Sequence, residues 1–148
     1  MHKNRSTTPC LGICSTTYGD DVCKGCKRFV HEIISWPKYS MEERAFVNDR
    51  LEKFKIIILQ ERFKIEDEQL FALRLKDNAI NYNNSLDSLT WIFDLLRAAG
   101  SQSIDLNQFG ITALKKYDSK TIKDEINQEL LDLSEAHHQR YLLSLIHI

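Results

Sequence analysis

The sequence predicts a mainly α-helical protein that begins with a loop-rich, four-cysteine metal knuckle docked on a helix pair. Three observations carry this prediction. Residues 10–26 hold all four cysteines and three of the five glycines. Beyond them, apolar residues recur at spacings of three and four, the periodicity of amphipathic helices. Proline, glycine and capping residues fall where those periodic stretches begin and end.

The helix pair is expected directly after the cysteines. A first helix begins near Lys27, and Pro37 ends it because proline lacks the amide that a helix needs. A second helix begins after Ser40, which can cap it while Glu43 reaches back to the Ser40 amide in a capping box. We expect this helix to run to about Arg62. The apolar stripes are Phe29, Val30, Ile33 and Ile34 in the first helix, and Val47, Leu51, Phe54 and Ile58 in the second.

The middle of the chain is less regular. Residues 65–84 fit two interpretations, because their apolar residues suit a helix but also alternate between Phe71 and Leu75 as in a short strand. Residues 78–85 are rich in asparagine, which predicts a loop.

Two further helices are expected towards the end. One is capped by Asp87 or Ser88 and stopped at Gly100, a short element follows at 106–114, and the last helix begins at 118–119. Their apolar faces are Leu89, Ile92, Phe93, Leu96 and Ala99 in the first, and Ile122, Ile126, Leu130, Leu133, His137 and Tyr141 in the second.

These patterns divide the chain into a metal-binding module with two helices at 8–62 and a helical region of unknown role at 65–142. The last six residues, 143–148, look like the translation of an adapter used in preparing sequencing libraries. The competing interpretation is an ordinary apolar helix end.

Charge and hydropathy exclude several classes of protein. Residues 1–64 carry 12 Lys/Arg and 8 Asp/Glu, an excess too small to predict a nucleic-acid surface. No apolar run approaches the roughly 18–20 residues that a membrane span requires. No secretory signal is recognisable, so the cytoplasm is the expected compartment.

The cysteines are the most informative feature. Cys10, Cys14, Cys23 and Cys26 form two close pairs joined by a short loop, the arrangement that tetrahedral metal binding needs. Gly25 can take a positive φ angle that folds the chain tightly around an ion. Two disulfides are the main alternative, but they suit exported proteins. The sequence therefore predicts one metal centre held by four thiolates.

Spacing alone favours zinc by a small margin over an iron–sulfur cluster. Paired knuckles of this kind are typical of structural zinc, whereas cubane clusters often take compact runs of three cysteines that this chain lacks. Because all four positions are filled by protein, no position stays open for a catalytic water.

The same segment resembles a bacterial family called domain of unknown function 1289. The resemblance covers residues 8–54 and rests on Thr8 through Cys14, Cys23 through Arg28, Glu32-Ile33, Trp36 and Ser40 through Arg44. It implies that Cys10, Cys14, Cys23 and Cys26 are the family's ligands. Members are commonly labelled predicted iron–sulfur proteins, which brings the two metals close to parity with zinc still slightly ahead.

Other candidate residues have plainer interpretations. His31 is expected on a helix surface, and His137-His138 is a poor metal pair because adjacent helical residues point in different directions. Trp36 is expected to pack the short helix against the metal loop. Trp91 and Phe93 are expected in the core.

No nucleotide-binding, metalloprotease or hydrolase motif is present, so the sequence does not predict an enzyme. The expected function is a non-enzymatic interaction module with structural zinc. Its expected partner is a protein, with nucleic acid only weakly supported and a membrane excluded. The alternative is a small iron–sulfur electron carrier or redox sensor.

Overall fold

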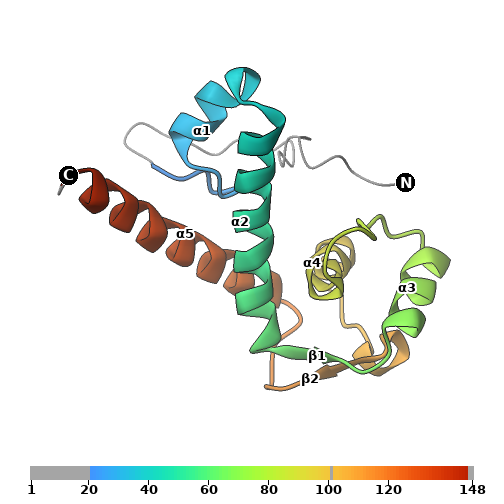
Figure 1. Ribbon diagram of the computed structural model, residues 1–148. Coiled ribbons are helices and arrows are strands. Elements are labelled where there is room, and N and C mark those ends of the chain that lie inside the picture. Colours follow the sequence, from blue (N-terminus) through green and yellow to red (C-terminus); the bar gives the residue numbers. More distant parts are fainter. Residues whose placement is uncertain (1–20, 101, 147–148) are drawn as a thin grey trace. The chain divides into compact units, whose positions relative to one another are not determined.

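The computed structural model describes residues 21–100 and 102–146, with side chains as far as Tyr141. The described residues are mainly helical, which confirms the predicted fold class (Figure 1). In chain order the elements are α1 (Val30–Ser35), the 3-10 helix η1 (Trp36–Lys38), α2 (Met41–Gln60), β1 (Phe63–Ile65), α3 (Glu68–Asp77), α4 (Ser88–Ala99), the 3-10 helix η2 (Leu106–Phe109), β2 (Ile111–Ala113) and α5 (Ile122–Ile146).

The described chain forms two compact units. The central unit comprises Lys55–Asn127, and the terminal unit comprises residues 21–54 together with residues 128–146. The helices α2 and α5 each run from one unit into the other. The predicted module limits, 8–62 and 65–142, stay predictions.

The first helix of the pair begins three residues later than expected, at Val30. Phe29 is still extended, with ψ at 147°, and its amide donates to the Glu32 carboxylate at 2.8 Å. This bond satisfies an amide that the helix cannot pair internally, so Glu32 fixes where α1 begins. Pro37 follows in η1 and ends the run, as predicted.

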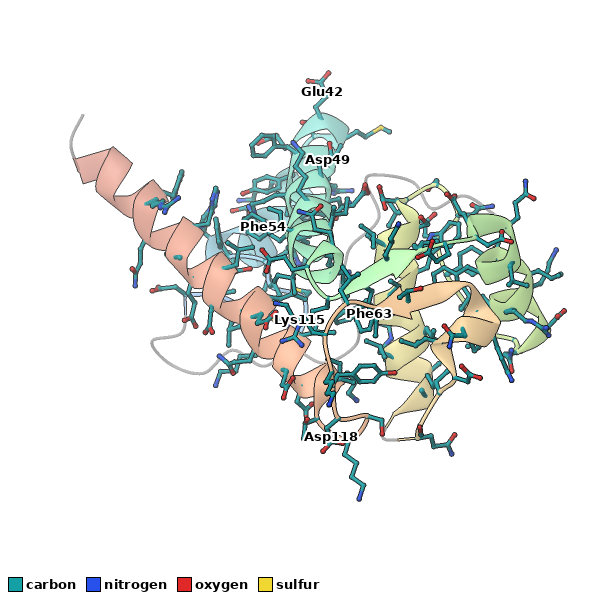
Figure 2. All side chains as sticks on the ribbon, turned by 90° about the horizontal axis from the view of Figure 1, so that it is seen from below. Glu42, Asp49, Phe54, Phe63, Lys115 and Asp118 are labelled. Carbon is teal, nitrogen blue, oxygen red and sulfur yellow. The ribbon has the colours of Figure 1, made fainter. Side chains whose placement is uncertain are left out.

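The capping box at the start of α2 is confirmed. The Ser40 amide donates to Glu43 Oε1 at 3.0 Å, and the Glu43 amide donates to Ser40 Oγ at 3.1 Å. Glu42 and Asp49 project from the exposed side of this helix (Figure 2). The helix ends at Gln60 instead of Arg62, because the chain must become extended for β1. The predicted apolar stripe is buried at all four positions, Val47, Leu51, Phe54 and Ile58.

The last helix corrects two predictions. It begins at Ile122 because the preceding turn uses Asp118 as its cap: the Asp118 side chain accepts the Lys120 amide at 2.9 Å. The buried stripe continues from Leu130 in steps of four to Ser134 and His138. The predicted stripe is confirmed at Ile122, Ile126 and Leu130. Its continuation through Leu133, His137 and Tyr141 is wrong, because the helix instead buries the polar residues one position along.

The central unit resolves the ambiguous stretch as a helix. Phe71 and Leu75 lie one turn apart on α3 and are both fully buried. The strands lie elsewhere: β1 pairs antiparallel with β2, with Phe63 opposite Ala113 and Ile65 opposite Ile111. Phe63, labelled in Figure 2, opens the first strand.

Gly110 permits the close approach of the segment that follows β1. It has a φ angle of 71°, and an added Cβ would lie 2.7 Å from the carbonyl oxygen of Asp67. Its own carbonyl accepts the amides of Glu66 and Asp67 at 2.7 and 3.2 Å. Both the positive φ and the contact therefore require glycine here.

The core of the central unit is apolar and aromatic. Phe71 packs against Trp91, with ring centroids 5.7 Å apart, and the Trp91 indole donates to the carbonyl of Asn83 in the predicted loop. Asp87 and Gly100 bound α4 as predicted. Trp91 is confirmed as a core residue, but Phe93 is only half-buried beneath the Lys55 and Arg97 cations.

Candidate metal centre

Two of the four predicted ligands lie among the described residues. Cys23 is buried and Cys26 is half-buried. Cys10 and Cys14 lie outside the described residues. The described part therefore holds half of the predicted ligand set. Within residues 21–100 and 102–146, no three His, Cys, Asp or Glu side chains form a metal-binding group.

Cys23 and Cys26 lie in a short loop closed by backbone hydrogen bonds. An antiparallel bridge pairs Val22 with Phe29, and the Cys23 amide donates to the Arg28 carbonyl at 2.9 Å. Within that bridge, the Lys27 amide donates to the Cys23 carbonyl, also at 2.9 Å. These bonds hold the segment in a tight turn, which is the shape that a metal-binding knuckle requires.

The tight turn does not depend on Gly25 in the predicted way. The residue with a positive φ angle is Lys27, at 68°. A non-glycine residue pays a steric cost there. Lys27 is itself buried, and its ammonium group donates to the carbonyls of Lys24 and Gly25. Those hydrogen bonds hold Lys27 in the positive-φ conformation that the sequence analysis expected at Gly25.

The Cys26 sulfur accepts hydrogen bonds from Arg28. The Arg28 Nε lies 3.2 Å from Cys26 Sγ, and a backbone hydrogen bond from Arg28 reaches the same side chain. Burial raises the pKa of the Cys26 thiol, and the contacts with Arg28 oppose that rise. A cation bound at the sulfur would favour the thiolate, which is the form that ligates metals.

Arg28 also contacts Trp36. The guanidinium carbon lies 4.9 Å from the centre of the indole ring, and Arg28 is buried. Trp36 in turn forms a cluster with Val47 and Leu51 of α2 and is only 8% exposed. Trp36 therefore packs between the cysteine loop and the second helix, in agreement with its predicted role.

Comparison with known families bears on this segment. Residues 8–55 match one protein family. Its description is "Protein of unknown function (DUF1289)", and the match confirms the resemblance predicted for residues 8–54. No curated protein and no solved structure matches the chain. The matched segment includes α1 and all four predicted ligands, Cys10, Cys14, Cys23 and Cys26.

A buried ion pair joins two helices within the matched segment, and the sequence analysis did not predict it. Arg50 of α2 donates from Nη1 and Nη2 to the two carboxylate oxygens of Glu32, each at 2.7 Å. Both side chains are buried. The sequence contained one indication: Arg50 lies on the apolar stripe, three residues after Val47 and four before Phe54. A charge at such a position needs a partner.

The ring of Phe29 lies between this ion pair and α5. The Arg50 guanidinium carbon lies 4.0 Å from the centre of the Phe29 ring, and His138 packs edge-on against it with centroids 4.7 Å apart. His137 also contacts Phe29, and this contact covers part of an otherwise exposed side chain. Partial burial lowers the pKa of His137, and the positive charges of Arg50 and Arg140 lower it further.

The histidines thus contribute ring packing. His31 is exposed on α1, as predicted. His137 stacks against the ring of Phe29, whereas His138 packs edge-on against the same ring. Among the described helices, none has the length and apolarity to cross a membrane.

Proposed function

We propose that the matched segment, residues 8–55, is a structural metal-binding module that holds one zinc ion through Cys10, Cys14, Cys23 and Cys26. We propose further that it serves as a non-enzymatic interaction module. The observation that carries the proposal is the loop of Cys23 and Cys26. Its backbone is closed by hydrogen bonds, and Arg28 donates to the Cys26 sulfur. Donors directed at sulfur are what a thiolate ligand needs, because they offset its negative charge.

The donor set fits zinc. Four thiolates at a Zn–S distance of about 2.3 Å complete a tetrahedron and leave no open position, so the ion would supply cross-linking and no reaction. A segment of this size buries too little apolar surface to be stable without help. In metal-dependent modules the free energy of metal binding is also free energy of folding. The helix α1 has only six residues, and a helix this short is not stable without support from its surroundings.

A protein is the proposed partner, and the cytoplasm is the proposed compartment. Large apolar side chains are exposed on α1 and at the start of α2: Ile34 and Phe46 are each 73% exposed, and Met41 is 65% exposed. We take these side chains as the candidate surface for a protein partner, because contiguous exposed apolar patches mark such surfaces. The weak basic excess gives nucleic acid much less support.

Metal analysis of the full-length protein tests the proposal. The protein should be purified without a histidine tag and without oxygen, and its zinc, iron and acid-labile sulfide measured. We expect about one zinc per chain, as four-cysteine structural sites bind. Cys23→Ser should lose the metal. Lys24→Ala is the matched control, because that side chain lies in the same loop but is exposed, and it should keep the zinc.

The same measurement decides against zinc if the outcome differs. A brown anaerobic sample with iron and sulfide, bleached by dithionite, would replace the zinc proposal with an iron–sulfur redox protein. Full metal content in Cys23→Ser would remove the four-cysteine site altogether. Zinc must be scored in the anaerobic sample, because zinc can enter a site from which a cluster has been lost.

A further inference from the structure

Arg28 makes two different contacts at once. Its Nε donates to Cys26 Sγ at 3.2 Å, and its guanidinium carbon lies 4.9 Å from the centre of the Trp36 ring. Arginine can do both at once, because its planar group donates along its edge and stacks with its face. The side chain is buried, so water screens neither contact strongly.

A second arginine at the same ring provides an internal comparison. The Arg44 guanidinium carbon lies 5.8 Å from the Trp36 ring centre. Its Nε and Nη2, however, donate to the carbonyls of Trp36 and Pro37 at 3.1 and 3.4 Å. Arg44 therefore holds the turn between α1 and α2, whereas Arg28 joins the same indole to a cysteine sulfur.

We propose that Arg28 is a positioning residue that couples occupancy of the cysteine site to the packing of Trp36 against α2. The inference rests on the proposed metal-binding function, because it concerns what happens at Arg28 when that site is filled. It goes further by naming the route along which the metal would affect the helix pair, from Cys26 through Arg28 and Trp36 to Val47 and Leu51.

The physical basis is the charge on the Cys26 sulfur. A metal-bound sulfur is a thiolate ligand, and a hydrogen bond from a cation to a charged acceptor is about twice as strong as one between neutral groups. Filling the site would hold the guanidinium at the sulfur and fix its position over the indole. Emptying it would release that restraint. Trp36 would then experience a different cation contact, and it is part of the apolar cluster with Val47 and Leu51.

The experiment follows the two tryptophans of the full-length chain. Protein carrying 5-fluorotryptophan gives one ¹⁹F resonance from Trp36 and one from Trp91, which are assigned with Trp36→Phe. Zinc alone is added to the reduced, metal-free protein without oxygen. We expect the Trp36 resonance to move and to stop moving at about one equivalent, as one structural site predicts. Trp91 lies in the central unit and serves as the unmoved reference.

The variants separate positioning from simple packing. Arg28→Gln should weaken zinc binding about 10- to 100-fold, as outer-shell substitutions do. At saturating zinc, it should also abolish the zinc-dependent shift of Trp36. Arg28→Lys keeps the charge but not the planar fork, so it should bind zinc better than Arg28→Gln and still lose the shift. Arg44→Gln is the matched control and should keep both the affinity and the shift.

The outcomes distinguish this inference from the proposed function. If the parent binds no zinc, both fail. If the parent binds zinc but Trp36 does not respond, or responds equally in the Arg28 variants, the coupling fails while the metal site stands. If Arg44→Gln abolishes the shift as well, the response belongs to the turn in general and the assignment to Arg28 is wrong. If both Arg28 variants remain unfolded with excess zinc, the role of Arg28 is structural only.

Discussion

The central unit and the terminal unit bury different kinds of side chain. Among the described residues, the buried charged side chains all lie in the terminal unit: Lys27, Arg28, Glu32 and Arg50. The buried polar side chains of the central unit are the neutral Asn83 and Thr90. Both units bury apolar side chains, but the terminal unit also depends on buried charged groups with specific hydrogen bonds and, we propose, on a metal ion.

This difference teaches how each unit should respond to perturbation. Apolar packing tolerates changes of pH and metal content, and it fails when volume is removed. A buried ion pair fails when one partner is removed, because the remaining charge is left without compensation. The following predictions test that distinction by amide hydrogen exchange, which reports each unit separately and does not require the chain to unfold in one step.

The largest expected effect is in the central unit. Phe71→Ala removes a fully buried ring that packs against Trp91 and Phe109, with ring centroids 5.7 and 6.4 Å away. We expect a loss of about 3–5 kcal/mol in the stability of α3 and α4, as for other buried phenylalanines. The control is Leu73→Ala on the same helix, where the side chain is 54% exposed and about 0.5 kcal/mol or less is expected. Equal losses in the two variants would contradict an apolar core centred on Phe71.

The corresponding change in the terminal unit removes a charge while keeping the volume. Glu32→Gln leaves Arg50 buried without its partner, and the expected loss is about 3 kcal/mol in the protection of α1 and α2. Adding Arg50→Met should restore part of the stability, because an apolar side chain can replace a buried ion pair. A loss in Glu32→Gln no larger than that in an exposed control such as Glu42→Gln would show that the pair is not the main support of this unit.

A smaller effect is expected at the exposed start of α2. Ser40→Ala removes the acceptor for the Glu43 amide, and we expect a loss of about 0.5–2 kcal/mol. Glu43→Gln is the control, since glutamine can also complete a capping box. If Ser40→Ala exchanges at the parent's rate throughout the first turn of α2, the box does not stabilise this helix.

The same cap shows what could be predicted from the sequence. Ser40 and Asp87 mark helix starts through their own side chains, so local residues suffice to place them. The sheet was missed because β1 and β2 have three residues each and pair across a long separation in sequence. A three-residue strand carries too little periodicity to be distinguished from neighbouring helix.

The shape of the loop around Cys23 and Cys26 was predictable in part for the same reason, while the metal site itself stays a prediction. The cysteine spacing is local and predicted the loop around Cys23 and Cys26, whose backbone is closed as a knuckle requires. The positive φ angle was assigned to Gly25 because glycine adopts it at no cost, but Lys27 adopts it and is held by its own side chain. The pairing of Glu32 with Arg50 is a tertiary contact over 18 residues, and no local pattern specifies it.

The smallest expected effect concerns pH and distinguishes the units by composition. Residues 55–127 contain no histidine, whereas His137 in the terminal unit has its pKa lowered from the ordinary value of 6.5. Folded protein therefore binds fewer protons at His137 than unfolded protein just below that pH. The contribution of His137 to the stability of the terminal unit should be fully present above its ordinary pKa of 6.5. It should decline as the pH falls from there towards the lower pKa of the folded state.

His137→Gln tests the assignment of this pH dependence. Exchange should be compared at pH 7.5 and 5.5, corrected for the intrinsic rate, with the metal content checked at both values. Parent and variant share all four cysteines, so any loss of metal acts on both, and their difference isolates His137.

We expect the parent to lose more protection in the terminal unit than His137→Gln, while α3 and α4 are unaffected in both proteins. The effect should be small, since the His137 side chain is exposed and water screens the nearby charges of Arg50 and Arg140. An equal decline in both proteins would assign the pH dependence to the cysteine site, and a decline in α4 would contradict the division between the units.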